Sequence, residues 1–184
     1  EGSLLPDTYK FERGDSRQKI LNLMRAKQRE VLNQIWARRS PEVPVRTPQE
    51  MVTLASIVEK ETGRADERPR VAGVFVNRLQ KRMRLQSDPT IVYGLVGGRG
   101  TLGRGILRSE IDRVTPSNTY AIEGLPPGPI ASPGWSAIQA ALKPASTDYL
   151  FFVAKADGSG GHTFSDTLRE HEAAVAHYRA ATHH

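Results

Sequence analysis

The stretch that most constrains the fold is Val52–Thr62, an apolar run that ends in two acidic residues, Glu59 and Glu61. The residues before it form a strong helix start, because Thr47 can cap the first turn and Pro48 suits the first helical position. At about 100° per residue, the apolar side chains make one stripe and the two glutamates lie on its opposite margins. Both cannot face one cleft, and the spacing does not choose between them.

A carboxyl group at the end of a buried helix suits acid catalysis. Burial disfavours the charged form, so the pKa of such a glutamate rises toward neutrality. A carboxylic acid that keeps its proton near neutral pH can protonate the leaving oxygen of a glycosidic bond. The pattern therefore indicates carboxylate chemistry around these two glutamates.

Other chemistries find little support in the sequence. The chain has no cysteine, which excludes disulfides, thiolate zinc sites and cysteine nucleophiles. His171 and His177 fall on different faces of one helix, and His162 beside a glycine turn is typical of a strand residue, so we predict no metal site. Residues 98–103 match the GxGxxG dinucleotide pattern, but no strand precedes them. The serine-hydrolase elbow and the P-loop are absent, and we expect no cofactor.

Hydrophobic periodicity predicts an α+β domain that is mainly helical, with a small antiparallel β-hairpin. We expect helices over about 16–39, 48–62, 66–79, from 89 onward, 134–142 and 166–181. Short strands are expected near Thr8, and over 149–154 and 162–164 as the hairpin. The glycine-rich residues 96–105 are predicted to form a flexible loop.

The length and composition fit one globular domain with a substantial core. The net charge of +6 suits an anionic partner, such as nucleic acid, a membrane surface or an acidic wall polymer, or only a basic soluble surface. The longest strongly apolar run, Tyr149–Ala154, is too short to cross a bilayer. Because the chain opens on Glu1 rather than Met, we expect a piece of a longer protein with any anchor upstream, and we set His183 and His184 aside as a tag remnant.

Two loops carry features whose role the pattern leaves open. Gln86, Ser87 and Asp88 precede Pro89, where they could bind sugar hydroxyls or simply cap a helix. Gly124–Gly134 holds four prolines in eleven residues, which makes it a stiff, extended segment. It could form the wall of a groove or a rigid linker.

Four blocks together resemble the endolytic murein transglycosylases, the MltG or YceG-like proteins. The blocks are Leu54–Thr62; Val71–Leu79 with Met83–Thr90 and Tyr93-Gly94; Asn118–Tyr120 with Gly124–Gly134; and Asp148–Ala154 with Gly161–Phe164. The resemblance extends from residue 1 to about residue 178, and its specificity comes from the order and spacing of the blocks. Residues 96–110 match least. Ser87 stands where the family commonly has Thr, and Ser132 where it commonly has Asn or Thr, so both positions keep a polar group.

The resemblance implies that residues 1–184 are the catalytic domain of a bacterial cell-wall enzyme, with a lysozyme-like helical core as the fold analogy. Such enzymes cleave the β-1,4 bond between N-acetylmuramic acid and N-acetylglucosamine within glycan strands. They carry an upstream membrane helix and a LysM-like part, neither of which we recognise in this chain. They face the periplasm or the outside of the cytoplasmic membrane, and they associate with the penicillin-binding synthesis machinery.

The resemblance also implies the site residues. It places catalysis on Glu59, the first glutamate of Val-Glu-Lys-Glu, and gives Glu61 a structural or supporting role. The expected substrate-binding residues are Gln86, Ser87, Asp88, Tyr93, Asn118, Thr119 and Tyr120.

The implied mechanism needs one carboxyl group. Protonated Glu59 would donate to the leaving glycosidic oxygen, and the C6 hydroxyl of the muramic acid would attack to give a 1,6-anhydro end. The ionised Glu59 would then accept the hydroxyl proton, so no second carboxylate is required. Three alternatives stay open: a muramidase-type hydrolase with Asp88 as second carboxylate, a non-catalytic wall-binding scaffold, and a basic nucleic-acid-binding module.

Overall fold

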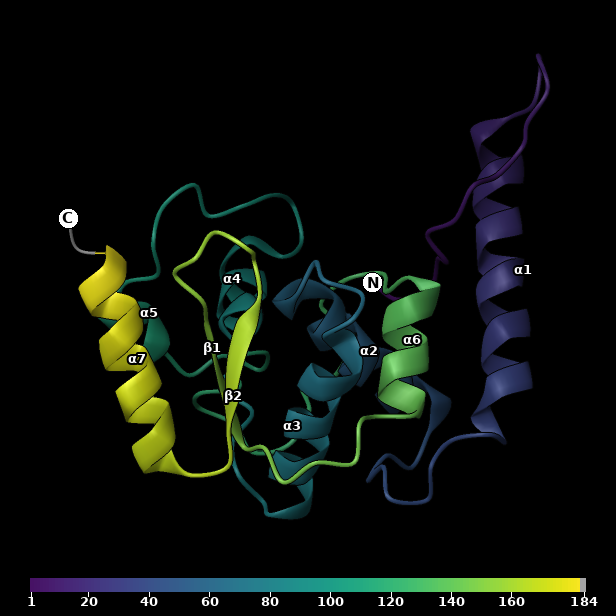
Figure 1. The fold of residues 1–184 in the computed structure, drawn as a ribbon. Coiled ribbons are helices and arrows are strands. Elements are labelled where there is room, and N and C mark those ends of the chain that lie inside the picture. The colour runs from purple at the N-terminus through teal and green to yellow at the C-terminus, as the bar shows by residue number, and fades with distance from the viewer. Residues whose placement is uncertain (183–184) are drawn as a thin grey trace.

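The structure, a computed structural model, describes residues 1–182, so the predicted tag remnant at His183 and His184 lies outside the described residues. Within that range the chain forms seven helices and one two-stranded antiparallel sheet (Figure 1). The elements in chain order are α1 (Arg17–Trp36), α2 (Pro48–Glu61), α3 (Arg68–Gln80), α4 (Asp88–Val96), α5 (Arg108–Ile111), α6 (Trp135–Leu142), β1 (Phe151–Ala154), β2 (His162–Ser165) and α7 (Leu168–Thr182).

Helix α2 lies at the centre of the fold. Its residues from Met51 to Val58 are all buried, and the helix packs against α6, α3 and the shorter α4. Its start is the one that the sequence predicts, because the Thr47 hydroxyl accepts a hydrogen bond from the Glu50 N–H at 3.1 Å. A helix that is buried on all sides is held at a fixed position and rotation by its neighbours.

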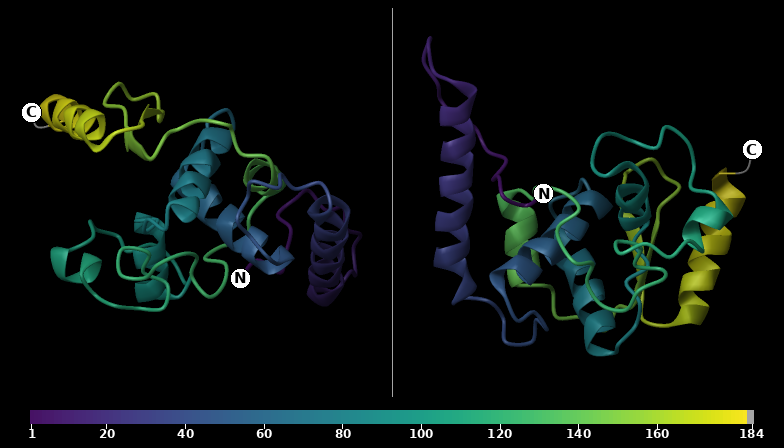
Figure 2. Two further views of the ribbon diagram at one scale, coloured as in Figure 1. Left: turned by 90° about the horizontal axis from the view of Figure 1, so that it is seen from below. Right: turned by 180° about the vertical axis from the view of Figure 1, so that it is seen from behind.

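The two ends of the chain flank this centre. Helix α1 stands at one side of the molecule, beside α6, and α7 stands at the opposite side, beside the hairpin (Figures 1 and 2). The N-terminal segment lies alongside α1. The Gln28 side-chain amide donates to the Gly2 carbonyl at 2.9 Å, and the Leu5 N–H donates to the Met24 carbonyl at 3.3 Å.

The fold class and the hairpin are confirmed. Strand β1 pairs with β2 from Phe151 opposite Ser165 to Ala154 opposite His162. The prediction of a strand near Thr8 is wrong. Among the described residues only β1 and β2 pair as a sheet, and the segment around Thr8 has no strand beside it to form hydrogen bonds with. The sequence also placed the end of α1 three residues too late and missed the short helix α5.

Across residues 1–182, no helix combines the length and the apolar character needed to span a bilayer.

The close approach of α3 to the segment after α6 predicts the effect of Gly73→Ala. A Cβ at Gly73 would lie 2.7 Å from the Ala145 carbonyl oxygen, and the Ala145 N–H already donates to the Pro69 carbonyl at 2.8 Å. Alanine gains about 1 kcal/mol in helix propensity, but overpacking costs about 1–3 kcal/mol. We expect urea denaturation to show a net loss of about 1 kcal/mol in the free energy of unfolding.

Gly105→Ala is the matched control, because no atom lies within 4 Å of a Cβ built there. It should change the free energy of unfolding by less than about 0.5 kcal/mol. A Gly73→Ala protein as stable as the unmodified chain would contradict the close approach.

Candidate active site

A cavity of about 360 Å³ opens at the C-terminal end of α2. Its walls come from α2, α3, the segment that leads into α4, the loop around residue 120, β1 and α7. The lining residues are Glu61, Arg78, Leu85, Gln86, Asp88, Tyr120, Phe152 and His171. The cavity, called the Glu61 pocket below, therefore joins parts of the chain that are far apart in sequence.

Glu61 is the acidic residue that α2 presents to this pocket. Part of its side chain is open to the cavity, but protein packs closely around the carboxyl group, and this burial raises its pKa to about 7. The Ser87 hydroxyl donates a hydrogen bond to Glu61 and opposes the rise, while the charge of Asp88 adds to it. A carboxyl group with this pKa holds its proton for a large share of the time at neutral pH.

Glu59 faces a different part of the protein. Its Oε2 accepts a hydrogen bond from the Gly134 N–H at 3.0 Å, and its Oε1 lies 3.5 Å from an Arg68 guanidinium nitrogen. Gly134 is the N-cap of α6, so the carboxylate also meets the positive end of that helix dipole. Glu59 does not line the Glu61 pocket. The two glutamates point in different directions, as the helical spacing predicts.

Arg78 organises one wall of the pocket from within α3. The side chain is buried, and this burial lowers its pKa below the ordinary value. Its Nε donates to the Leu150 carbonyl at 2.6 Å, and its Nη1 donates to the Leu85 carbonyl at 3.1 Å and to Gln86 Oε1 at 3.0 Å. One guanidinium therefore fixes both the segment before α4 and the start of the hairpin.

Three of the predicted substrate-binding residues line this pocket. Gln86 has a φ of 53°, a left-handed conformation that is strained for a residue other than glycine and common at functional sites. The Tyr120 hydroxyl donates to Asp88 Oδ1 at 2.6 Å, and burial raises the pKa of Tyr120. Gln86, Asp88 and Tyr120 can thus present polar groups to one ligand.

Ser87, Asn118 and Thr119, which the sequence also predicted as substrate-binding residues, have buried side chains. Ser87 stands at the N-cap position of α4, but its buried hydroxyl donates to Glu61 and makes no capping bond. The Thr119 hydroxyl accepts from the Ser87 N–H at 2.9 Å. The Asn118 amide donates to the carbonyl of Ile111, at the end of α5, at 2.9 Å and to that of Arg113 at 2.7 Å. These residues hold the loops that carry Gln86 and Tyr120.

Tyr93 lies apart from these residues. It lines a neighbouring cavity of about 600 Å³, between α4, the glycine-rich loop and the proline-rich segment near Ser132. This second cavity shares only Asp88 with the Glu61 pocket. The proline-rich segment therefore lines a cavity, which fits one of the two roles that the sequence left open, the wall of a groove.

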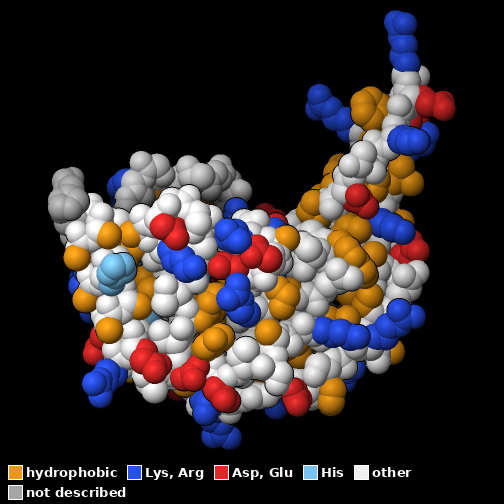
Figure 3. Space-filling view, in the orientation of Figure 1, with side chains coloured by type: hydrophobic (Ala, Val, Ile, Leu, Met, Phe, Trp, Pro, Cys, Tyr) orange, Lys and Arg blue, Asp and Glu red, His pale blue; other side chains and the backbone are white. Residues whose placement is uncertain are grey.

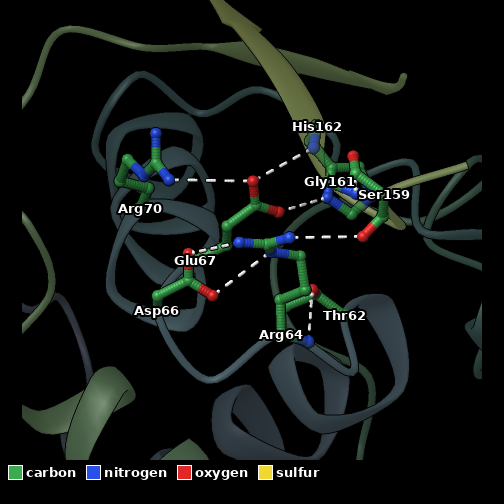
Figure 4. Close-up of polar contacts among 8 residues, drawn as sticks. All are labelled: Thr62, Arg64, Asp66, Glu67, Arg70, Ser159, Gly161 and His162. Atoms are coloured by element: carbon green, nitrogen blue, oxygen red, sulfur yellow. Dashed lines mark hydrogen bonds and ion pairs between the residues drawn. The ribbon is translucent and has the colours of Figure 1, made fainter. Parts of the chain in front are cut away.

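A group of polar contacts holds the hairpin against the corner between α2 and α3 (Figure 4). Glu67 is buried, and its carboxylate accepts from the His162 N–H at 3.1 Å and bonds the His162 ring Nδ1 at 2.7 Å. Arg64 reaches from the same corner to the Ser159 carbonyl at 3.2 Å. These contacts set the position of β1, which forms part of the pocket wall.

Sequence reasoning missed two polar residues of the pocket, Arg78 and His171. A signal was present for both. Arg78 continues the apolar spacing of Val71, Val74 and Phe75, so it lies on the buried face of α3. His171 begins an equivalent spacing on the partly buried face of α7. A polar residue on a buried helical stripe is the pattern to look for.

The face shown in Figure 3 carries basic and acidic side chains mixed together over the body of the molecule. It shows no extended patch of one sign. Among residues 1–182, no three His, Asp or Glu side chains converge as a metal site.

Comparisons with known proteins agree on one family. The model of the YceG-like family matches residues 1–177. An endolytic murein transglycosylase of Bacillus subtilis is 36% identical over 97% of this chain, and one of Streptococcus pneumoniae is 32% identical over 97%. The chain spans 48% of the length of the first relative and 32% of the second.

The fold is also that of a solved structure. A crystal structure of a yceG-like protein from Listeria monocytogenes superposes with a TM-score of 0.78 at 36% sequence identity. The match covers 94% of this chain and 54% of that one.

The surroundings of the two glutamates predict opposite effects on stability above pH 7. The folded pKa of Glu61 is raised from an ordinary 4.5 to about 7. Stability is therefore full below pH 4.5 and falls as the pH rises toward 7, because the folded state binds the proton more tightly. Glu61→Gln removes this loss, and we expect it to raise the free energy of unfolding at pH 8 by on the order of 2 kcal/mol.

Glu59→Gln is the matched change two residues earlier. It removes a charge that bonds Gly134 and pairs with Arg68, so its thermal midpoint at pH 8 should fall below that of the unmodified chain. Melting curves of both variants at pH 4 and pH 8 test the pair. A lower midpoint for Glu61→Gln at pH 8 would contradict the described environment.

Proposed function

Because the chain belongs to the YceG-like family, we propose that it is the catalytic region of an endolytic murein transglycosylase, which cleaves peptidoglycan strands internally. The proposal depends on one observation at the Glu61 pocket. A carboxyl group with a pKa near 7 lies in a pocket lined by several polar side chains. Acid-catalysed cleavage of a glycosidic bond needs such a group.

We propose Glu61 as the catalytic acid, in place of the Glu59 that the sequence resemblance favoured. Glu61 lines the pocket, whereas the Glu59 carboxylate meets the Gly134 N–H and Arg68. Both Glu59 oxygens are engaged outside the pocket, so Glu59 is not placed to protonate a glycosidic oxygen beside Glu61. In this assignment Glu59 stabilises the packing of α2 on α6, and the roles of the two glutamates are exchanged.

The reaction then follows from one carboxyl group. Protonated Glu61 donates its proton to the glycosidic oxygen as the bond from that oxygen to C1 of N-acetylmuramic acid breaks. The C6 hydroxyl of the same sugar attacks C1 and closes a 1,6-anhydro ring. Its proton passes to the ionised Glu61, which restores the acid. Water is not consumed, so the two products together have the mass of the substrate.

The other pocket residues position the sugar. Gln86, Asp88 and Tyr120 offer an amide, a carboxylate and a hydroxyl on the wall beside Glu61. Ser87 holds the Glu61 carboxyl in place, and Arg78 holds the backbone on either side of the pocket. Groups that are fixed before the substrate binds need little rearrangement in the transition state.

A hydrolytic reaction is the second candidate, and one observation favours it. Asp88 lines the same pocket as Glu61 and could activate a water molecule, as the second carboxylate of a muramidase does. Its bond from the Tyr120 hydroxyl suits a positioning role equally well. The mass of the product ends separates the two reactions, since anhydro ends are lighter by one water.

The proposed substrate also implies a location. Peptidoglycan lies outside the cytoplasmic membrane, so we place the domain on that side, with an upstream anchor and the penicillin-binding synthesis machinery as partner.

Glu61→Gln should lower the rate of cleavage of purified sacculi by at least about 100-fold, because it removes the general acid. Glu59→Gln should retain activity within about tenfold, since its effect passes only through the packing of α6. Mass analysis of the released fragments gives both the rate and the type of end. The reverse ranking would return catalysis to Glu59, and full activity in both variants would remove both glutamates from catalysis. No cleavage by the unmodified chain would support a non-catalytic wall-binding domain.

The pH dependence of the reaction should follow the raised pKa of Glu61. The free enzyme must be protonated at Glu61 to start the reaction, so kcat/KM should fall about tenfold per pH unit above about pH 7. Soluble glycan strands allow the measurement between pH 5 and 9. A kcat/KM that stays constant from pH 6 to 9 would exclude a group of this pKa as the essential acid.

A further inference from the structure

His171 is the pocket residue to which the proposed mechanism gives no role. It lies on α7, a helix that packs on β1 and β2, and its ring reaches the Glu61 pocket beside Arg78 and Phe152. The ring is stacked on Phe151, with 5.1 Å between the centroids and 19° between the planes. This stack fixes the plane of the imidazole, so the edge that meets the cavity is defined by the fold.

The polar atoms of His171 are not satisfied by the protein. Its Nδ1 is buried and has no hydrogen-bond partner among the described residues. An unpaired polar atom in the interior costs about 1–3 kcal/mol and calls for an explanation. An apolar residue of similar shape would fill the same wall without that cost, so packing alone does not account for a histidine here.

The burial of Nδ1 also decides which nitrogen can meet a ligand. Burial and the neighbouring Arg78 lower the pKa of His171 below its ordinary value, so the ring is neutral at neutral pH. A neutral imidazole carries one proton, and a buried nitrogen without an acceptor is the poorer place for it. The proton therefore belongs on Nε2, which is not among the buried, unpartnered atoms and can donate to an oxygen in the pocket.

We propose that His171 is a substrate-binding residue, whose Nε2–H donates a hydrogen bond to a hydroxyl or acetamido oxygen of the sugar next to Glu61. This inference rests on the proposed function for the identity of the ligand, an N-acetylated β-1,4-linked glycan. It adds a recognition group from α7 to those on the segment that carries Gln86 and Asp88. The sugar would then be held from α7 as well as from the segment before α4.

The direct test is nuclear magnetic resonance of the histidine rings in the Glu61→Gln protein, which binds without turnover. The probe is a tetrasaccharide of alternating N-acetylglucosamine and N-acetylmuramic acid. We expect the Nε2 and ring-proton resonances of His171 to shift on titration, whereas those of His177, an exposed residue on the same helix, should not. Unshifted His171 resonances at saturating tetrasaccharide, or no binding at all, would overturn the proposal.

His171→Phe separates binding from packing. The ring and its stack on Phe151 are kept, while the donor is lost. We expect the dissociation constant of the tetrasaccharide to rise about tenfold, with the thermal midpoint within a few degrees of that of the parent. His171→Asn, which keeps a donor amide, should recover part of the affinity. An unchanged dissociation constant in His171→Phe would show that the ring only fills the wall.

The control variant is His177→Phe, which alters α7 away from the Glu61 pocket and should leave the dissociation constant unchanged. The proposed function fails separately, through the cleavage rates of the Glu61 and Glu59 variants. The His171 proposal is tested by binding alone. A protein that binds the tetrasaccharide through His171 but does not cleave it would uphold the His171 proposal and reject the proposed function.

Discussion

The burial of α2 on every side is the constraint on which the rest of the structure depends. Eight successive residues from Met51 to Val58 are enclosed, so the helix can neither rotate nor slide without disturbing α3 and α6. The two glutamates that follow are therefore aimed by the core. Glu59 leaves toward the start of α6, and Glu61 leaves toward the pocket. Their chemistry differs because one meets two donors and the other meets burial with a single hydroxyl.

Much of the fold could be predicted from the sequence, because its signals are local. Thr47 and Pro48 predict the start of α2, and two short runs of strand-forming residues separated by a glycine turn predict the hairpin. The prediction of a strand near Thr8 was wrong because a strand needs a neighbouring strand to pair with, and residue preferences do not show whether one is present.

The site was harder to predict, since it is made by distant contacts. The partners that separate the two glutamates are Gly134, 75 residues from Glu59, and Ser87, 26 residues from Glu61. Helical spacing could place the acids on different faces but could not show what each face would meet. In the same way, polar side chains mark Asn118 and Thr119 as bonding residues without showing that their partners are backbone groups and another threonine.

The pocket draws its walls from segments that are synthesised far apart in time. Glu61, Arg78 and Gln86 emerge from the ribosome well before Phe152 and His171, yet all of them line the same cavity. A nascent chain that ends before β1 carries Glu61 but lacks the parts of the pocket wall that Phe152 and His171 supply. The Glu61 pocket is thus complete only after nearly the whole domain has been made and folded.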